Sequence, residues 1–510
     1  MPPKKIAIVG SGRSGIGALW ALRSTDHEVH LFEASPQLGG QTNTIAFEGR
    51  NGKETQVDLG TITMNTTTNA NFIRFLKHMG VTTKTTEMSF GVTRDAGDFE
   101  WATTSLATIF AQQRSFLSPG RWRLLFDIIR FNQFALDAIV IEDESKQRSS
   151  APSQSGPARS HPGMSIREYL DLEGYSQTFK NDYLIPMTAM LWSRTPNNCA
   201  LDVPASVLVR IMWNHHLLDT FTKAPDYLTV PDSTGQYIEA VMKDFPQERV
   251  HLDSKVTAAI PEVEGKVTLR VKDEDLPFDH VVLAIRGDQA LDILKPVATK
   301  QELNVLSGFR TYHNIAVLHS DLSLMPQRPL TWSACNFITE SPFPPTGTSN
   351  MSRMCLTYWM NLVQDIRENE FGPVLVTLNP LHPPKAELTQ GVWECSCSSY
   401  NERAVRSQQL VSTIQNRRGI SYCGAWTDHS FHENGFSSGL AVAQNHLGAK
   451  LPFDLVNPAS SRGPKPILTL KDHAARLLIQ AIQLLIRIVG IFLDTLHAST
   501  GRLEGKSKLT

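Results

Sequence analysis

The chain has 510 residues, of which 41% are hydrophobic and 19% charged, and its formal net charge is −1. This length exceeds that of an ordinary single domain, so two domains are expected. The near-neutral charge gives no electrostatic basis for binding nucleic acid. The six cysteines form no C-x-x-C pair, which favours reduced thiols in an intracellular protein. The first apolar run begins at Ile6, which leaves no room for a signal peptide.

A nucleotide-binding pattern opens the chain. The apolar run Ile6–Val9 predicts a buried parallel strand, and Gly10, Gly12 and Gly15 follow in G-x-G-x-x-G spacing. This spacing is typical of a turn that brings backbone close to a pyrophosphate at the N-terminus of a helix, here expected over residues 14–23. A second strand, residues 29–32, ends at Glu33, where an acid accepts hydrogen bonds from an adenosine ribose.

The residues after Glu33 distinguish between cofactors. A chain that binds only NAD needs no special sequence there, whereas this one continues ASPQLGGQT over residues 34–42. That extension resembles the one in FAD-binding flavoproteins of the amine oxidase type, which favours FAD over NAD. The turn VDLGTITMN, residues 57–65, is then expected to face the flavin through Gly60 and Thr61. An ordinary turn after a strand is the alternative.

The middle of the chain is harder to interpret. Aromatic and aliphatic residues recur at helical spacing over residues 96–142, which indicates core helices or helices covering an apolar pocket. Residues 143–163 are polar and rich in serine and proline, so a disordered insertion is expected there. His215 and His216 are adjacent, but no carboxylate or further histidine lies at ligand spacing, so no metal site is predicted.

Near the C-terminus, the apolar strand ending at Gly424 leads into HENGFSSGLAVA, residues 432–443. Asn434 and Gly435 suit the start of a helix, whose N-terminus would stabilise negative charge on a reduced flavin. The alternative is an ordinary glycine-rich turn between a strand and a helix.

Three stretches, residues 10–44, 57–65 and 422–443, together resemble the flavin-containing amine oxidoreductase superfamily. More narrowly, the chain is similar to the predicted NAD/FAD-binding proteins found beside, or fused to, cyclopropane fatty acid synthases, over nearly all of residues 4–453. The resemblance implies an α/β fold of the amine oxidase and phytoene desaturase type. A discontinuous Rossmann-type FAD-binding domain (1–95, 225–293 and 409–453) would carry a discontinuous α+β substrate domain (96–224 and 294–408).

The resemblance also implies which residues contact non-covalent FAD. Those around the pyrophosphate, ribose and adenine would be Gly10, Ser11, Gly12, Ser14, Gly15, Glu33, Ala34 and Val256. Those along the diphosphate, ribityl chain and flavin would be Gly39, Gly40, Gln41, Thr42, Gly60, Thr61, Gly424, Glu433, Asn434, Gly435 and Phe436. The chain departs from the family pattern at several positions, including Gln41 for histidine, Asn434 for aspartate and Cys397-Ser398 for His-Pro. These departures bear on the substrate rather than on FAD.

A helix of a different kind ends the chain, within residues 465–498. From Leu470 the polar residues Arg476, Gln480, Gln483 and Arg487 recur every three or four positions, and the residues between them are apolar. Arg487 in mid-run argues against a membrane span and favours an amphipathic helix, over 470–498, lying in a membrane interface. Packing on its own domain or on a second copy in a homodimer is the alternative.

These observations predict an FAD-dependent oxidoreductase that transfers a hydride from an apolar, lipid-like substrate, fatty acyl or isoprenoid, by desaturation or isomerisation. The alternatives are an amine or polyamine oxidase and a non-catalytic flavoprotein partner of a lipid-modifying enzyme. The candidates for acid–base roles are His432, Glu433, His215 and Tyr358.

Overall fold

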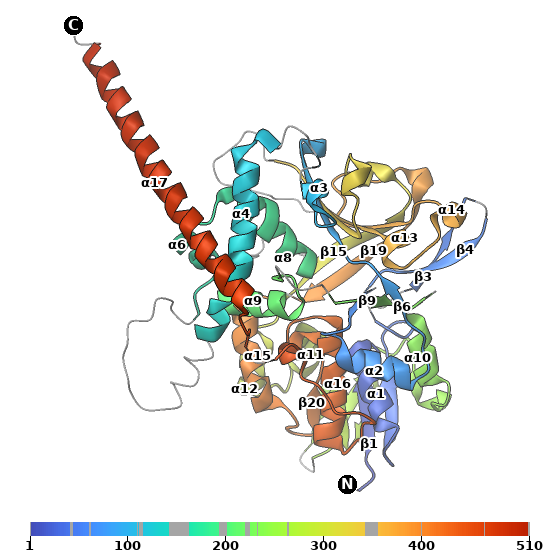
Figure 1. The fold of residues 1–510 in the computed structure, drawn as a ribbon. Coiled ribbons are helices and arrows are strands. Elements are labelled where there is room, and N and C mark those ends of the chain that lie inside the picture. The colour runs from blue at the N-terminus through green and yellow to red at the C-terminus, as the bar shows by residue number, and fades with distance from the viewer. Residues whose placement is uncertain are drawn as a thin grey trace, which may run out of the picture.

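The computed structural model shows two adjoining layered regions and a projecting C-terminal helix (Figure 1). It describes residues 2–40, 44–50, 52–60, 63–109, 111, 116–141, 163–192, 201–219, 225–231, 233–262, 265–341, 355–398, 400–463 and 465–507. The expected insertion at 143–163 therefore lies, except for Gly163, outside the described residues.

The first region is built on a parallel five-stranded sheet in the order β10-β2-β1-β14-β20. Its strands are β1 (Lys5–Val9), β2 (Glu28–Phe32), β10 (Val250–His251), β14 (His280–Leu283) and β20 (Ile420–Tyr422). The central strands β1 and β14 are almost entirely buried, as a parallel sheet covered on both faces requires. Helices α1 (Arg13–Leu22) and α16 (His432–Leu447) pack against each other on this sheet, although more than 400 residues separate their starts.

Smaller elements complete this region. They are the antiparallel sheet β11 (Val256–Pro261), β12 (Val267–Val271) and β13 (Glu274–Phe278), the sheet β5 (Met64–Asn65), β9 (Tyr227–Thr229) and β6 (Lys84–Thr86), and helices α2 (Ala70–His78), α10 (Gly235–Met242), α11 (Gly287–Leu294), α12 (Lys300–Leu306) and α15 (Glu402–Ile414). The expected Rossmann-type domain is confirmed in this sheet order and in the strand–turn–helix at the N-terminus.

The second region contains a seven-stranded sheet covered by helices. The strand order is β19 (Thr389–Ser398), β15 (Thr311–His319), β18 (Leu375–Leu378), β17 (Cys355–Trp359), β16 (Cys335–Thr339), β7 (Phe90–Arg94) and β8 (Phe99–Ala102). All neighbours are antiparallel except β16 and β7. The helices are α3 (Leu106–Ile109), α4 (Pro119–Phe134), α6 (Ile166–Leu172), α7 (Gln177–Phe179), α8 (Ile185–Trp192), α9 (Ala205–Asn214), α13 (Met360–Val363) and α14 (Glu368–Phe371), and the ribbon β3 (Thr44–Glu48) and β4 (Glu54–Asp58) lies at one edge.

Packing moves two of the expected domain boundaries. Strand β7 falls within the expected segment 1–95, yet it pairs with β16 in the seven-stranded sheet. Helices α12 and α15 fall mostly in the expected substrate domain, yet Val305 and Val411 share one apolar core with Val9 of the Rossmann sheet. Strand pairing and burial decide these memberships, and neither is visible in local patterns.

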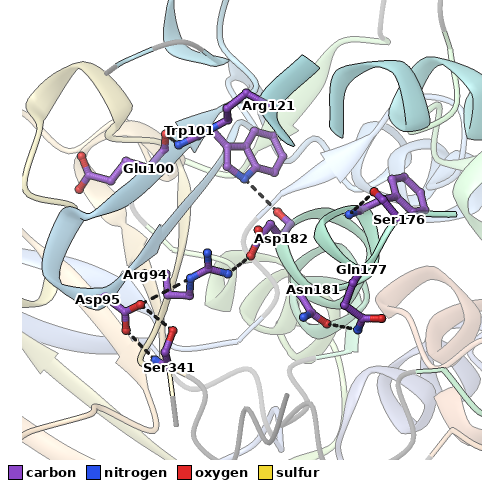
Figure 2. Close-up of polar contacts among 11 residues, drawn as sticks. Arg94, Asp95, Glu100, Trp101, Arg121, Ser176, Gln177, Asn181, Asp182 and Ser341 are labelled. Atoms are coloured by element: carbon purple, nitrogen blue, oxygen red, sulfur yellow. Dashed lines mark hydrogen bonds and ion pairs between the residues drawn. The ribbon is translucent and has the colours of Figure 1, made fainter. Parts of the chain in front are cut away.

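A buried ion pair joins the seven-stranded sheet to its helical cover, as Figure 2 shows. Arg94, the last residue of β7, pairs with Asp182, which lies in the π-helical turn Lys180–Leu184. The Trp101 Nε1–H of β8 donates to the Asp182 backbone carbonyl at 2.9 Å. Burial raises the pKa of Asp182 to about 6, against the lowering effect of Arg94 and Arg121. The cluster thus ties the β7–β8 hairpin to the helices.

Helix α17 (Leu470–Ser507) departs from the body beside α4 (Figure 1). It begins at Leu470, as the sequence pattern predicted, and it includes all of the apolar run. Over the residues that the structure describes, none of the helices combines the length and apolar character needed to cross a bilayer.

Candidate functional site: a dinucleotide cradle between two helix N-termini

The glycine turn and Glu33 form one hydrogen-bonded unit at the carboxyl ends of β1 and β2. The Ser11 N–H and hydroxyl both donate to Glu33 Oε2, at 2.9 and 2.6 Å, and the Ser35 N–H donates to Oε1 at 2.9 Å. The Gly39 N–H donates to Ser11 Oγ at 3.0 Å. A carboxylate has about four acceptor positions, so Glu33 retains capacity on Oε1 for a ribose hydroxyl. Glu33 thus follows β2 directly and could accept from a ribose, the role that the sequence predicts for it.

Gly12 offers the clearest test of whether these residues fit a dinucleotide. A Cβ on Gly12 would meet no atom within 4 Å, whereas a Cβ on Gly15 would lie 1.9 Å from the Gly10 carbonyl oxygen. Gly15 thus serves close packing, while Gly12 borders open space at the N-terminus of the ten-residue helix α1. That N-terminus has no side-chain cap, so its N–H groups suit a phosphate. The turn fits a pyrophosphate.

The start of α16 supplies the second part of the site. The Gly424 N–H donates to Ser438 Oγ at 2.9 Å, and Asn434 Nδ2 donates to Asp428 Oδ2 at 2.7 Å. Gly435 lies against the stem of Arg13, because a Cβ there would be 3.1 Å from Arg13 Cγ. The N-termini of α1 and α16 are therefore adjacent, so Gly12 and Gly435 lie close enough to contribute to one site.

Close contact between α1 and α16 depends on glycines that the sequence reasoning missed. A Cβ on Gly439 would lie 2.1 Å from the Ser14 carbonyl oxygen, and one on Gly17 would lie 2.9 Å from the Phe436 carbonyl oxygen. The Phe436 ring packs in the core beside Phe72 and Phe75. Its side chain therefore has a structural place, and only its backbone remains for the expected flavin contact. The four-residue spacing of Gly435 and Gly439 was the available signal.

Arg13 is a second residue that the motif reading passed over. Its side chain is partly buried, and burial lowers its pKa. Tyr237 of α10 and Cys397 of β19 oppose this lowering electrostatically. A cation thus lies where α1, α16 and the seven-stranded sheet converge. The signal in the sequence was an arginine inside a glycine motif.

Glu433, a candidate for both flavin contact and catalysis, caps helix α2. Its carboxylate accepts the Asn71 N–H at 2.9 Å, the Phe72 N–H at 3.1 Å and the Ser437 hydroxyl at 3.0 Å. Burial nevertheless raises its pKa to about 7. These contacts make Glu433 a structural link between α16 and α2, with its carboxylate oxygens directed at α2.

The other acid–base candidates occupy different surroundings. The His432 ring is buried against Phe72 and near Arg13, and burial followed by Arg13 lowers its pKa well below the usual value. His215 packs on Phe431 at 4.7 Å, and burial lowers its pKa to about 4. Both histidines are therefore neutral at pH 7. Tyr358 of β17 lies between two apolar cores of the second region.

A small cavity separates the start of α16 from α9. Its volume is about 20 Å³, enough for about one water, and it is lined by Thr68, Asn69, Ile211, Asn214, His215, His429, Phe431, Glu433, Asn434 and Pro458. Beside it, the Trp192 and Tyr400 rings stack at 5.3 Å, and Tyr400 meets His429 edge-on at 6.2 Å. His216 Nδ1 lies 2.7 Å from Asp219 Oδ2, so the two adjacent histidines contact different neighbours.

The remaining residues predicted to contact FAD lie outside the described residues or make few contacts that bear on a cofactor. Gln41, Thr42 and Thr61 lie outside the described residues, while Gly60 follows β4 and Ala34 follows Glu33. Gly40 lies over the glycine turn, because a Cβ there would be 3.1 Å from Gly12 Cα. Val256 is buried at the start of β11, opposite Val271.

The family model that matches is the NAD(P)-binding Rossmann-like domain, over residues 8–79. The chain is 30% identical over 122 residues to the flavin-dependent L-tryptophan oxidase RebO of Lentzea aerocolonigenes, which covers 24% of this chain and 25% of that protein. It is 50% identical over 42 residues to an L-amino acid oxidase of Cerastes cerastes, 8% of each chain. The chain thus spans at most a quarter of the length of these two relatives.

Solved structures extend the likeness to the whole fold. A fatty acid isomerase from P. acnes superposes with a TM-score of 0.56 at 16% identity, covering 87% of this chain and 98% of that one. A putrescine oxidase variant gives a TM-score of 0.59 at 15% identity, with the same coverage. These identities establish the fold. The N-terminal sequence matches and the paired helix N-termini agree with this fold, which the chain shares with flavin-dependent oxidases of the amine oxidase type.

Proposed function

We propose that the protein is an FAD-dependent oxidoreductase acting on an apolar, lipid-like substrate, fatty acyl or isoprenoid, by desaturation or isomerisation. When bound, the flavin supplies the chemistry by accepting a hydride from a substrate C–H bond. Desaturation would also release a proton to solvent and would require oxygen or an electron carrier as the final acceptor of two electrons. Isomerisation would require no external acceptor, because the substrate undergoes no net oxidation.

The observation that carries this proposal is the aromatic wall beside the N-terminus of α16. Trp192, Tyr400 and Phe431 contribute aromatic surface there, and the two histidines next to them, His215 and His429, touch rings. His215 is kept neutral by burial. A neutral, water-poor surface favours a hydrocarbon chain, because a charged group would lose hydration without gaining a counter-ion. The fold shared with a fatty acid isomerase agrees with this reading.

The glycine turn Gly10–Gly15, Glu33 and the start of α16, together called the cradle, bind and orient the cofactor in this proposal. The uncapped N-terminus of α1 binds the pyrophosphate, and Glu33 accepts from the ribose. The positive end of the α16 dipole favours negative charge on the group beside it. The aromatic wall excludes water and holds the substrate carbon against the cofactor.

The second candidate is an amine oxidase. The stacked pair Trp192 and Tyr400 is the kind of surface that attracts an ammonium group through cation–π contact. Putrescine oxidase and the L-amino acid oxidases among the similar proteins support it. The third reading, a non-catalytic flavoprotein partner of a lipid-modifying enzyme, requires the cradle alone.

Anaerobic mixing of the FAD-loaded protein with candidate substrates separates these readings. Loss of the flavin's visible absorption with fatty acyl or isoprenoid lipids, or a shifted double bond in the recovered lipid, supports the proposal. Bleaching by amines or amino acids and not by lipids supports the amine oxidase. A flavin unchanged by every class, with no lipid product, supports the non-catalytic reading and overturns the proposal.

A pair of phenylalanine variants tests whether Phe431 contributes to the substrate site. Phe431→Ala removes part of the wall and is expected to lower kcat/KM for the bleaching substrate at least about tenfold, which corresponds to about 1.4 kcal/mol of transition-state stabilisation. Phe116→Ala is the matched control, because Phe116 is half-exposed beside α4. Equal activity of the two variants would remove Phe431 from the site.

A further inference from the structure

The free part of α17 is an unpartnered apolar surface with a defined attachment. Among the described side chains, the contacts that fasten the helix lie near its start, where the Thr469 hydroxyl caps it through Asp472 and Arg476 pairs with Asp137 at 2.9 Å. Gln133 Nε2 of α4 donates to Asp472 at 3.2 Å. Ile479, 4% exposed, is the last buried side chain among those described. Beyond it the helix runs away from the body (Figure 1).

The surface that follows is dominated by large apolar side chains. Leu478 and Leu485 are each 62% exposed. Six more large apolar residues of the same segment are at least one-third exposed: Leu477, Ile482, Leu484, Ile486, Ile488 and Val489. At about 100° per residue, Arg476, Gln480, Gln483 and Arg487 fall within a stripe about 60° wide. The remaining circumference is apolar over about 220°.

We propose that α17 docks the protein on an anionic lipid surface, lying in the membrane interface with this apolar face buried. Three features favour lipid over a second copy of the chain. A two-helix seam needs only a narrow apolar stripe flanked by polar residues, whereas this face covers more than half of the helix. On the polar stripe Arg487 complements anionic headgroups, while Arg476 pairs with Asp137 and Asp494 follows on the same side of the helix. The sequence after residue 500 adds Arg502, Lys506 and Lys508 against one acid, Glu504.

The connection between α17 and the candidate site is also built into the fold. Asn214 Nδ2 of α9 donates to the Ala459 carbonyl at 2.8 Å, and Arg462 binds Asp219 at 2.7 Å. Asn214 lines the small cavity beside α16. The segment before α17 is therefore held against the wall of the site, so docking brings that wall near the lipid. The docking itself does not depend on which substrate the site takes.

Flotation of the FAD-loaded, full-length protein with vesicles tests the proposal. One set contains phosphatidylcholine alone and the other an equal mixture of phosphatidylcholine and phosphatidylglycerol. The protein is expected to float with the mixed vesicles, and the flavin absorption of the floated fraction shows that it is intact. Failure to float with either set overturns the proposal.

Two triple variants distinguish vesicle binding by α17 from nonspecific hydrophobic adsorption of the protein. Leu484→Gln, Leu485→Gln and Ile488→Gln together are expected to reduce binding at least about tenfold. These side chains lie on the exposed face of α17, so the body should remain folded and flavin-loaded. The control carries Leu303→Gln, Leu330→Gln and Leu410→Gln, which change exposed leucines elsewhere and should leave flotation unchanged. Equal flotation of the two variants would refute the role of α17.

Charge and self-association are tested in the same preparations. Arg487→Glu should weaken flotation with the mixed vesicles more than with phosphatidylcholine alone. Light scattering without lipid reports oligomeric state. A dimer that becomes a monomer in the α17 triple variant, with no vesicle binding by the wild type, would assign the face to a second copy and overturn the proposal. Loss of catalysis with flotation intact would instead count against the proposed function alone.

Discussion

Replacing Gly12 with alanine should separate cofactor binding from folding. Gly12 has φ −60° and ψ 177°, which alanine adopts without strain, and its Cβ would meet no atom within 4 Å. A compatible Gly→Ala change stabilises by about 0.4–1 kcal/mol through the unfolded state. Alanine is a poorer helix N-cap than glycine by a similar amount. The two effects oppose each other, so the stability without FAD should change by less than about 1 kcal/mol.

The same methyl group should greatly weaken FAD binding. It would occupy the space at the N-terminus of α1 through which a pyrophosphate must approach the N–H groups. Hydrogen bonds to a charged group contribute about 1.5–3 kcal/mol each, and losing two costs at least about 3 kcal/mol. The dissociation constant for FAD should then rise by about a hundredfold or more, since each 1.4 kcal/mol is tenfold.

Two measurements check this prediction. Flavin fluorescence titration gives the FAD affinity, and thermal unfolding without FAD gives stability. Gly120→Ala is a neutral control, with its Cβ 3.7 Å from Ser118 Oγ. Gly439→Ala should instead lower the unfolding temperature even without FAD, because its Cβ would lie 2.1 Å from the Ser14 carbonyl oxygen. Wild-type FAD affinity in Gly12→Ala would show that the pyrophosphate does not approach α1 at this point.

Two further predictions concern buried carboxylates. Because burial raises the pKa of Glu433 to about 7, the folded protein keeps a proton that the unfolded chain loses near its ordinary pKa of about 4.3. The contribution of Glu433 to stability should therefore fall as pH rises through this window. Glu433→Gln should flatten that dependence in denaturant unfolding at several pH values, and an unchanged slope would assign it to other groups. Asp182→Asn removes the buried carboxylate that pairs with Arg94, which keeps Asp95 at 3.6 Å, and should cost about 2 kcal/mol. The control Asp275→Asn breaks an exposed pair with Arg270 and should cost far less, so equal losses would contradict the burial argument.

The local features of the site were readable from sequence because they depend on short spacings. The turn from Gly10 to Gly15 follows one strand and begins one helix, and Glu33 ends the next strand. The capping box of Ser165 with Glu168 at the start of α6 is likewise a short-range feature. The start of α17 was predicted from periodicity, which is also a local property.

Long-range packing determined the features that the sequence did not reveal. Glu433 lies in a glycine-rich turn that resembles a flavin contact, yet its carboxylate caps α2, which begins more than 360 residues earlier in the chain. Arg13 has no local sign of its surroundings, because Tyr237 and Cys397, which act on it electrostatically, come from different elements. The membership of β7 likewise depends on its partner β16.

The sequence by itself determined that this protein has a dinucleotide cradle and an amphipathic terminal helix, because each is specified by residues within a few turns of one another. Only the tertiary structure decided which buried charges the cradle encloses and which candidate residues serve packing instead. The physical reason is that burial and hydrogen-bond partners belong to pairs of segments. A side chain such as Glu433 acquires its pKa and its role only when the helix that it caps is in place.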